Sequence, residues 1–544
     1  MAYGRRLKVG VLALLCGMGA AAQAGAADIL NATASSGGLV PSSGQYAGIH
    51  IMSPNAEEAN SDMDGLNMTA GQKVTLNIGS AADGLVEANS KHNVRGIFVY
   101  DTFDKSSVLV VNGPLQVSLN GTGEYSIVKG IESSTFRNQV GEGDQPQPDY
   151  TGGYIQLNGD TKVKVTSGGN GYGLIAGGDF YNNVNPNGSI FLRGNSDISV
   201  TTTMVGKGDR AQTMGVLAFA KGSINFGGQE STIHKINVSG ANNGETNREI
   251  AGIYVSHGGQ VNSNNNSTLD ISVTGKKIYG INVGFYDQVL LDGDRKPVDY
   301  RGDSKVNLNG NTIISLNNKR MGLATGVESS MKSNAKLNSA DIRFMNPDAA
   351  NSNWLFGLHT EEEGKIDVGS LYIGTNGSTV TDPTKITAIL TEGKADLYKR
   401  PYANSGTINV NTDDKGTVQV NGQVKSLDDG TINLHLTNAN SYLYGNARVV
   451  YGMSEGTINL KLDNGAKWTN VRGDYDLDSE VTNLTLNNGA LIDMTDTTYV
   501  NEAKHGKYQS IYVDQDMIGT GGTIHRDCQV FCVNFLGLET HYSL

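Results

Sequence analysis

"IAGIYVSHGGQ", residues 250–260, is followed by "IYGINVGFYDQ", residues 278–288, and the two segments share one frame. Each contains a Gly, an Ile, one variable residue and a Val in succession. Because side chains alternate along a strand, Ile253 and Val255 lie on one face and Tyr254 lies on the other. The repeated phrase therefore predicts a short strand with one aliphatic face.

This phrase recurs along most of the chain, at spacings of 28 to 48 residues and with one final gap of 64 residues. Repeats of this length indicate a solenoid, in which each repeat is a structural unit that stacks on its neighbours. The repeat positions are Gly48, Gly96, Gly130, Gly173, Gly215, Gly252, Gly280, Gly322, Gly357, Ala388 and Gly452.

Each repeat contains two further aliphatic segments, of which one begins nine residues after the Gly and the next follows about ten residues later. Three short strands joined by turns make one triangular coil, and stacked coils make a parallel β-helix. We therefore predict an all-β fold, a right-handed single-stranded parallel β-helix (solenoid) of about 15 to 20 coils. The inward residues expected on the second and third strands include Ile224, Val261, Val289, Ile366, Ile236, Val238, Ile271, Val273, Leu371 and Ile373.

Glycine and asparagine mark the bends of the predicted coil. The Gly that precedes each aliphatic pair predicts a tight corner or a close approach of two backbones. Asn-Gly dipeptides are expected at corners because both residues tolerate a positive φ. Examples are Asn120-Gly121, Asn158-Gly159, Asn309-Gly310 and Asn421-Gly422. The repeated phrase is therefore interpreted as scaffold and not as a binding site.

The N-terminal residues 1–26 have a basic start, an apolar stretch and small residues at their end, which together predict a secretory signal peptide with cleavage within residues 24–27. The net charge of -12 and the lack of a basic patch argue against a nucleic-acid partner. Apart from Cys16, the cysteines are Cys528 and Cys532, so the body of an exported chain is held by packing and hydrogen bonds.

Proline and charge concentrate in segments between the repeats, at residues 137–153, 292–303 and 375–385. A stack of coils tolerates such insertions at its corners, so these loops are the expected location of function. Arg301, Gly302 and Asp303 form a candidate receptor-binding loop, and the same tripeptide occurs at residues 472–474. The alternative is that Gly-Asp is ordinary turn chemistry.

From about residue 481 the sequence pattern changes, first to "VTNLTLNNGALIDMTDT" and then to "YQSIYVDQDMIGTGGTIHRD". This ending resembles the last coils and the autochaperone region of autotransporter passenger domains, the adhesin or pertactin-like β-helices of type V secretion. The matching residues are Leu484, Leu486, Asn488, Gly489, Ala490, Val513, Asp516, Gly519, Gly521, Gly522, Thr523 and Ile524.

The resemblance implies export by the signal peptide, then passage of the β-helix through a C-terminal outer-membrane barrel to the surface of a Gram-negative-type bacterium. The chain departs from that pattern, because no barrel strands follow Ile524 and the last residues change in texture. We expect residues 528–544 to be an atypical, truncated or frameshifted tail. A truncated chain would stay in the periplasm. A genuine short ending is the alternative.

Enzyme and metal motifs are weak in this sequence. Glu361, Glu362 and Glu363 form an acidic run and Asp428-Asp429 a pair, but neighbours on a strand point to opposite faces, so solvated loop charge is the favoured interpretation. No metal-binding or cofactor-binding motif occurs, and no catalytic residue is assigned. Tyr254 and Phe98 would form either an exposed stripe or a cover for neighbouring strands. His50 and His257 are expected at outward or corner positions.

The sequence thus predicts four regions: a signal peptide at 1–26, a β-helix passenger at 27–480, autochaperone-like coils at 481–527 and the tail at 528–544. The expected function is adhesion, at the cell surface or after secretion, to a glycan or protein of a host or neighbouring cell, with self-association as a further option. The alternatives are a β-helical carbohydrate-active enzyme, which three or more carboxylates from successive coils would favour, and a non-functional truncated product.

Overall fold

The structure is a computed structural model, and it describes residues 29–34, 40–42, 46–52, 63–69, 73–81, 84–91, 93–101, 107–135, 153–178, 188–203, 212–241, 249–284, 290–291, 297–298, 304–345, 354–376, 383–392, 406–450, 455–471, 478–496 and 509–525. The chain divides into two compact units. Unit 1 comprises Met1–Arg248, Gly258–Ser267 and Gln288–Asp299, and unit 2 comprises Glu249–His257, Thr268–Asp287 and Tyr300–Leu544.

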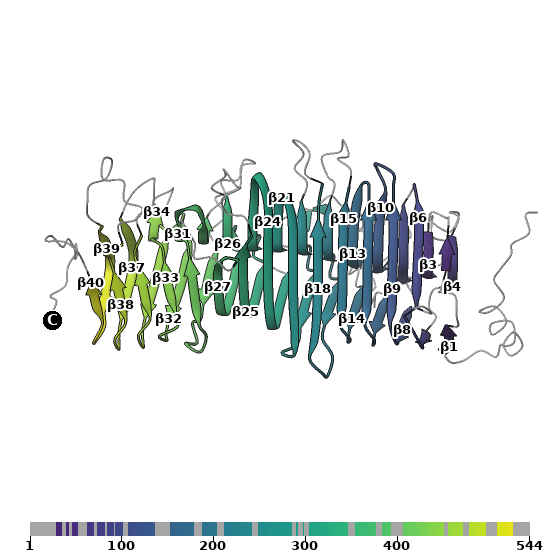
Figure 1. Cartoon of the computed structure of the whole chain (residues 1–544), viewed down its shortest axis with the longest axis horizontal. Coiled ribbons are helices and arrows are strands. Elements are labelled where there is room, and N and C mark those ends of the chain that lie inside the picture. Colours follow the sequence, from purple (N-terminus) through teal and green to yellow (C-terminus); the bar gives the residue numbers. More distant parts are fainter. Residues whose placement is uncertain are drawn as a thin grey trace, which may run out of the picture. The chain divides into compact units, whose positions relative to one another are not determined.

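Unit 1 consists of coils whose strands pair in parallel with the equivalent strands of the next coil, so that three ladders form (Figure 1). The first ladder contains β4 (Met63–Thr69), β3 (Tyr46–Met52), β7 (Val94–Asp101), β10 (Ile127–Thr135), β13 (Asn170–Gly178) and β16 (Thr213–Ala218). The second contains β1 (Ile29–Ala34), β5 (Lys73–Ile78), β8 (Val108–Asn112), β11 (Tyr154–Leu157), β14 (Ser189–Leu192), β17 (Ser223–Phe226) and β20 (Gln260–Ser263). The third contains β2 (Val40–Ser42), β6 (Leu85–Ser90), β9 (Leu115–Gly121), β12 (Thr161–Ser167), β15 (Ser196–Thr202) and β18 (Thr232–Ser239).

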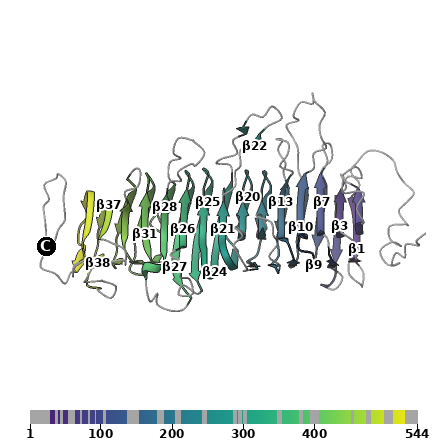
Figure 2. The same cartoon turned by 90° about the horizontal axis from the view of Figure 1, so that it is seen from above.

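Unit 2 repeats the three ladders, although several of its strands run through more than one of them (Figure 2). The first ladder contains β19 (Ile250–Val255), β21 (Ser267–Val283), β24 (Lys305–Ser329), β26 (Leu355–Glu361), β28 (Thr387–Glu392), β31 (Gln423–Leu427) and β34 (Ala447–Val450). The other ladders are continued by β25 (Asn334–Phe344), β27 (Lys365–Thr375), β29 (Thr407–Val410), β30 (Val418–Asn421), β32 (Thr431–Leu436), β33 (Tyr442–Tyr444), β35 (Thr457–Leu462), β36 (Lys467–Thr469), β37 (Ser479–Leu486), β38 (Leu491–Asp493), β39 (Ile511–Ile518) and β40 (Thr523–His525).

Two short features complete the described elements. A 3-10 helix, η3, spans Pro383–Lys385, and an antiparallel pair joins β22 (Leu290–Leu291) to β23 (Pro297–Val298). None of the helices in the described ranges has the length and hydropathy that a membrane span requires.

Aliphatic side chains in register fill the interior of each unit. In the second ladder of unit 1, Leu109, Ile155 and Ile190 stack in that order, and none of them is exposed. Burying a side chain of this size contributes about 1.5–3 kcal/mol. The predicted parallel β-helix is therefore confirmed in each unit. The inward residues expected on the second and third strands are buried as predicted, except Val289, which lies outside the described residues.

Several strands of the first ladder, from β16 to β28, differ from those of the other two because they are buried on both faces, whereas the later strands β31 and β34 alternate again. Side chains alternate between buried and partly exposed along β11 and β14, whereas all six residues of β19 are buried. Phe98 and Tyr254, on the outward face, are only 2% and 3% exposed. They therefore cover neighbouring strands, which is the second of the two predicted alternatives, and form no exposed stripe.

The glycine that precedes most of the aliphatic pairs has a steric cause. A Cβ atom on Gly326 would lie 2.5 Å from the carbonyl oxygen of Gly357 and 2.7 Å from Cγ2 of Ile342, inside the coil. Gly357 stands in the same relation to the carbonyl of Ala388, at 2.4 Å. Glycine is therefore favoured at these positions because consecutive coils approach closely there, which is the second of the two sequence interpretations and not a tight corner.

The repeat position at Gly322 was placed wrongly by the sequence pattern. Val327 pairs with Ile281 and Leu358, so Gly326, and not Gly322, continues the glycine column. The segment Gly322–Gly326 contains two glycines four residues apart, each followed by an aliphatic residue, and the pattern alone did not distinguish them.

Corners of the coil use different residues from those predicted. Of the four Asn-Gly dipeptides named from the sequence, only Asn421-Gly422 has a positive φ, at Gly422 (φ 137°). Gly121 and Gly159 instead avoid clashes with an adjacent coil or strand. The described corners with two successive positive φ values are built by Ala220-Lys221, Met331-Lys332, Glu362-Glu363 and Asp428-Asp429, together with His257-Gly258, Asn464-Gly465 and Asn488-Gly489.

Candidate functional site

A histidine and three glutamates from three successive coils of unit 2 meet on the outward face of the first ladder. We call Glu328, His359, Glu361 and Glu392 the histidine–carboxylate cluster. Glu328 lies near the end of β24, His359 and Glu361 lie on β26, and Glu392 ends β28. In the register of the ladder, Glu328 is paired with His359, and Glu361 is paired with Glu392.

Strand alternation explains why His359 and Glu361 point the same way. Leu358 is inside the coil and fully buried, so His359 points outward, Thr360 points inward and Glu361 points outward again. Stacking of the coils then brings Glu328 to one side of the imidazole ring and Glu392 beside Glu361.

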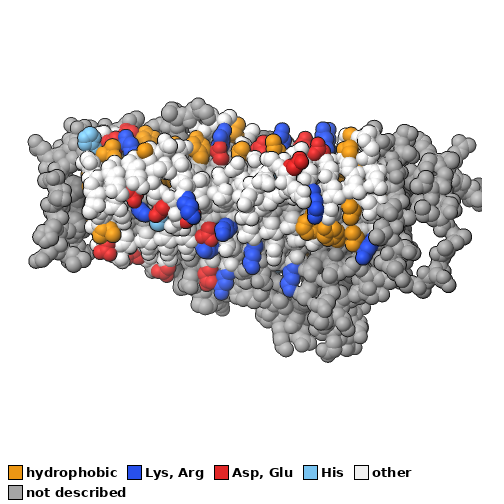
Figure 3. All heavy atoms as spheres, turned by 90° about the horizontal axis from the view of Figure 1, so that it is seen from below, with side chains coloured by type: hydrophobic (Ala, Val, Ile, Leu, Met, Phe, Trp, Pro, Cys, Tyr) orange, Lys and Arg blue, Asp and Glu red, His pale blue; other side chains and the backbone are white. Residues whose placement is uncertain are grey.

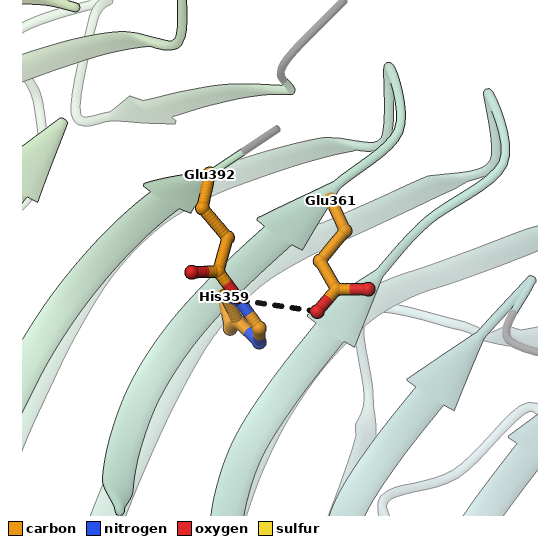
Figure 4. Close-up of side chains that lie close together, drawn as sticks. All are labelled: His359, Glu361 and Glu392. Atoms are coloured by element: carbon orange, nitrogen blue, oxygen red, sulfur yellow. Dashed lines mark hydrogen bonds and ion pairs between the residues drawn. The ribbon is translucent and has the colours of Figure 1, made fainter. Parts of the chain in front are cut away.

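The two ring nitrogens of His359 face different carboxylates. Nδ1 lies 3.4 Å from Oε2 of Glu328. Nε2 lies 3.1 Å from Oε1 of Glu392 and 3.8 Å from Oε1 of Glu361. Figure 4 shows the carboxyl groups of Glu361 and Glu392, from neighbouring strands, close to the ring. One ligand atom from each of these three residues lies within 4.8 Å of the others.

Exposure increases from one end of the cluster to the other. The side chains of Glu328 and His359 are 3% and 5% exposed, whereas those of Glu361 and Glu392 are 12% and 35% exposed. Oε1 of Glu328 is buried without a hydrogen-bond partner, and so are both amide atoms of Asn282, its neighbour in the ladder. The cluster therefore reaches solvent through Glu361 and Glu392 and has unsatisfied polar atoms at its buried end.

The carboxylates strongly favour the protonated imidazole. Burial lowers the pKa of His359, but hydrogen bonding and charge interactions with Glu328, Glu392 and Glu361 outweigh burial and raise this pKa to about 10. The cluster thus favours a positive charge at the position of the ring.

Aromatic rings connect this cluster to an exposed tryptophan. The ring of Phe356 lies 4.9 Å from the ring of His359, and the ring of Trp354 lies 6.3 Å from that of Phe356. Trp354 is 60% exposed, which is uncommon for a large apolar side chain in this structure. An exposed indole beside a polar cluster is suited to contacts with a ligand.

A comparable cluster in unit 1 is compensated internally. Glu132, also outward on the first ladder, is contacted by Lys129 at 2.8 Å and by Arg95 at 3.2 Å. Burial raises the pKa of Glu132, but these two cations hold it below its ordinary value. Arg95 also lies 4.6 Å from the centre of the Phe98 ring. This cluster is a structural ion-pair network.

Some residues named in the sequence analysis lie outside the described part of the chain, and others lie at corners or on the outward face. Arg301, Gly302 and Asp303 lie outside the described residues, as do residues 472–474, Cys528 and Cys532. Glu362-Glu363 and Asp428-Asp429 are corner pairs, in agreement with the favoured interpretation, and Glu363 pairs with Lys332 of the preceding corner at 3.2 Å. His50 is outward but only 1% exposed, and His257 occupies a corner with φ 51°.

Glu361 is an exception, because it belongs to the cluster and not to a solvated loop. The signal was present in "GLHTEEE", where His359 fills the variable position of the repeated phrase and Glu361 follows two residues later on the same strand face. Glu328 could not be connected with them, since the repeat was aligned on Gly322 instead of Gly326.

Comparisons with known proteins add no further assignment: no family model, no curated protein and no solved structure matches this chain.

Proposed function

We propose that the chain is the passenger of a type V secretion system, an exported β-helix that acts as an adhesin at the cell surface or after release. Two observations support this proposal. The parallel β-helix is the fold expected for such passengers, and the C-terminal sequence that resembles an autochaperone region forms stacked coils in unit 2.

The C-terminal coils provide the strongest support for this proposal. Leu484, Leu486 and Ala490 are inward and at most 6% exposed, and Asn488-Gly489 forms a corner with φ values of 46° and 73°. The next coil continues this arrangement, because Val481 pairs with Val513 and Ile492 pairs with Ile524. The residues of the sequence motif therefore act together as one folded element, as a template for further coils would require.

The polar composition of the surface supports a binding function. On the face shown in Figure 3, uncharged polar side chains and backbone predominate among the described residues, and charged side chains are scattered. Such a surface suits contacts with glycans or with other polar surfaces through many hydrogen bonds. Trp354 adds an exposed aromatic ring in unit 2.

Surface labelling of cells that produce the full chain tests export. An antibody raised against unit 2 should bind intact cells, or the protein should accumulate in the medium. Deletion of residues 1–26 should abolish both signals while leaving the total amount of protein detectable in lysed cells. Antigen that is found only after the outer membrane is opened would contradict surface display.

Attachment assays test the binding function and the candidate loop. Beads coated with the full chain should bind host cells or arrayed glycans. The change Asp303→Ala should reduce attachment if the Arg301–Asp303 loop binds a receptor, and Asp474→Ala, in the second copy of the tripeptide, is the matched control. Unchanged attachment of the Asp303→Ala protein would remove the loop as the receptor-binding site.

A β-helical carbohydrate-active enzyme is the second candidate. The observation that favours it is the convergence of Glu328, Glu361 and Glu392 from three successive coils. Incubation with acidic and neutral polysaccharides should then release new reducing or unsaturated ends, and Glu361→Gln should abolish this release. Absence of product with all polysaccharides would remove this candidate and leave the adhesin proposal intact.

A further inference from the structure

The arrangement around His359 matches that of a metal-binding histidine. Ligand atoms at about 2.0–2.2 Å from a tetrahedral Zn²⁺ lie about 3.3–3.6 Å from one another. The distances from Nε2 of His359 to Oε1 of Glu392 and Oε1 of Glu361, 3.1 and 3.8 Å, lie on either side of that range. Small side-chain rotations would therefore place all three atoms around one cation.

A single hydrogen bond accounts for Glu392 but not for Glu361. Nε2 lies 3.1 Å from Oε1 of Glu392, within hydrogen-bond distance, whereas Oε1 of Glu361 at 3.8 Å is too far away to accept a hydrogen bond from it. A cation between the three atoms contacts all of them at once and offsets the carboxylate charge. Imidazole together with carboxylates is a donor set that suits Zn²⁺ and other first-row divalent metals.

The buried side of the ring provides an independent indication. Histidines that bind metals usually donate their other ring N–H to a carboxylate, which fixes the tautomer and the orientation of the ring. Glu328, which is 2% exposed, faces Nδ1 of His359 across 3.4 Å. Its Oε1 has no hydrogen-bond partner, so the carboxylate is not held there for another described contact.

We propose that His359, Glu361 and Glu392 bind a divalent transition-metal cation, for which Zn²⁺ fits best, and that Glu328 orients the His359 ring from its buried side. Nε2 binds the metal in its unprotonated form, and a small rotation of the ring would let the N–H at Nδ1, which is buried without a hydrogen-bond partner, donate to Glu328. Because Glu392 is the most exposed ligand, the metal has an open position toward solvent, from which it is able to contact a ligand carboxylate or hydroxyl.

Calorimetric titration of the full chain with ZnCl₂ tests this site. The protein is first treated with EDTA, and its thiols are alkylated so that Cys528 and Cys532 do not bind zinc. We expect one high-affinity site per chain, with the Kd at least about 10-fold weaker in His359→Gln and in Glu361→Gln. Glu363→Gln, which removes the same charge two residues away at a corner paired with Lys332, should keep the wild-type Kd.

Two further measurements guard against misfolding and against weak surface binding. Glu392→Gln alters a partly exposed side chain and should weaken binding without changing the melting temperature of the metal-free protein. Glu328→Gln should weaken binding about 10- to 100-fold at unchanged stoichiometry. No tight site in the wild type, or equal affinity in His359→Gln and Glu363→Gln, would overturn the proposal. Equal affinity for Ca²⁺ would overturn the assignment to a transition metal, because Ca²⁺ prefers oxygen ligands only.

Discussion

Two buried histidines, one in each unit, show how neighbouring side chains decide the state of a buried group. In unit 1, His234 is 0% exposed and lies between two hydroxyl groups, with Nδ1 3.0 Å from Oγ of Ser196 and Nε2 3.0 Å from Oγ1 of Thr232. In unit 2, His359 is 4% exposed and lies between carboxylates. Both rings also contact a phenylalanine, at 4.9 Å in each case.

The consequences for the two rings are opposite. Burial lowers the pKa of His234 to about 4, because hydroxyl groups satisfy the neutral ring without compensating a charge. Burial acts in the same direction on His359, but its carboxylates raise the pKa to about 10. The similar packing of the two rings therefore produces a structural residue in one place and a candidate cation site in the other.

The largest expected effect comes from forcing the coils apart beneath His359. Gly326→Val would place side-chain atoms against the carbonyl of Gly357, where a Cβ alone already lies at 2.5 Å. We expect a loss of more than about 3 kcal/mol in the free energy of unfolding, or a loss of soluble protein. Gly489→Asn is the control, because Gly489 has no atom within 4 Å of an added Cβ and Asn tolerates its φ of 73°. Equal urea midpoints for the two variants would contradict close stacking at this position.

Acid should destabilise the protein through His234. Its pKa in the folded protein, about 4, lies below the 6.5 of the unfolded chain, so the unfolded chain takes up a proton first as the pH falls. The contribution of His234 is therefore fully present above pH 6.5 and is lost down to about pH 4, by about 3 kcal/mol for this residue alone. His257, whose pKa burial also lowers to about 4, adds to the loss in the same range. His359 has a raised pKa and adds no loss in this window.

Chemical denaturation at several pH values measures the effect. The difference in unfolding free energy between wild type and His234→Gln should shrink by about 3 kcal/mol between pH 7 and pH 4. A difference that stays constant over this range would show that the pKa of His234 is the same in the folded and the unfolded protein.

A smaller effect is expected in a column of asparagines that extends the comparison to amides. Asn433 donates to Oδ1 of Asn409 at 2.7 Å and accepts from Asn459 at 2.7 Å. The column begins at Asp367 and ends at Asn483, which accepts from the backbone N–H of Asp516. Each amide offers both a donor and an acceptor, so identical residues satisfy one another without a proton or a cation.

Asn433→Asp should therefore cost about 2 kcal/mol near neutral pH, because two acceptors then face each other at the contact with Asn409. The loss should diminish in acid, where the carboxyl group regains a proton to donate. Asp367→Asn, at the end of the column, keeps the acceptor and should cost less than about 1 kcal/mol. Thermal melts of both variants at two pH values provide the measurement, and equal losses for them would contradict a directional column.

The sequence predicted the coil because its determinants are local and repeated. The alternation of Ile253 and Val255 with Tyr254 identified the strand, and the preceding Gly identified the position where backbones approach closely. The corners were predicted less well. Residues such as Glu362 and Asp428 adopt a positive φ there, and their residue types do not by themselves indicate this conformation.

The histidine–carboxylate cluster could not be predicted from the sequence, for a different reason. The cluster depends on the register between coils that are separated by loops of unequal length. The repeat was aligned on Gly322, four residues before Gly326, so Glu328 was not aligned with His359. The sequence left two alternatives for the outward residues Tyr254 and Phe98, an exposed stripe or a cover for neighbouring strands, because an alternating pattern identifies the inward side chains and does not show what covers the other side.

Histidine-selective ¹⁵N NMR at pH 7 tests the central comparison most directly, with the two rings assigned by His234→Gln and His359→Gln. Without divalent cations, we expect a neutral ring for His234 and a doubly protonated ring for His359. Addition of Zn²⁺ should remove the Nε2 proton of His359 and leave His234 unchanged. A neutral His359 that does not respond to Zn²⁺ would contradict the account.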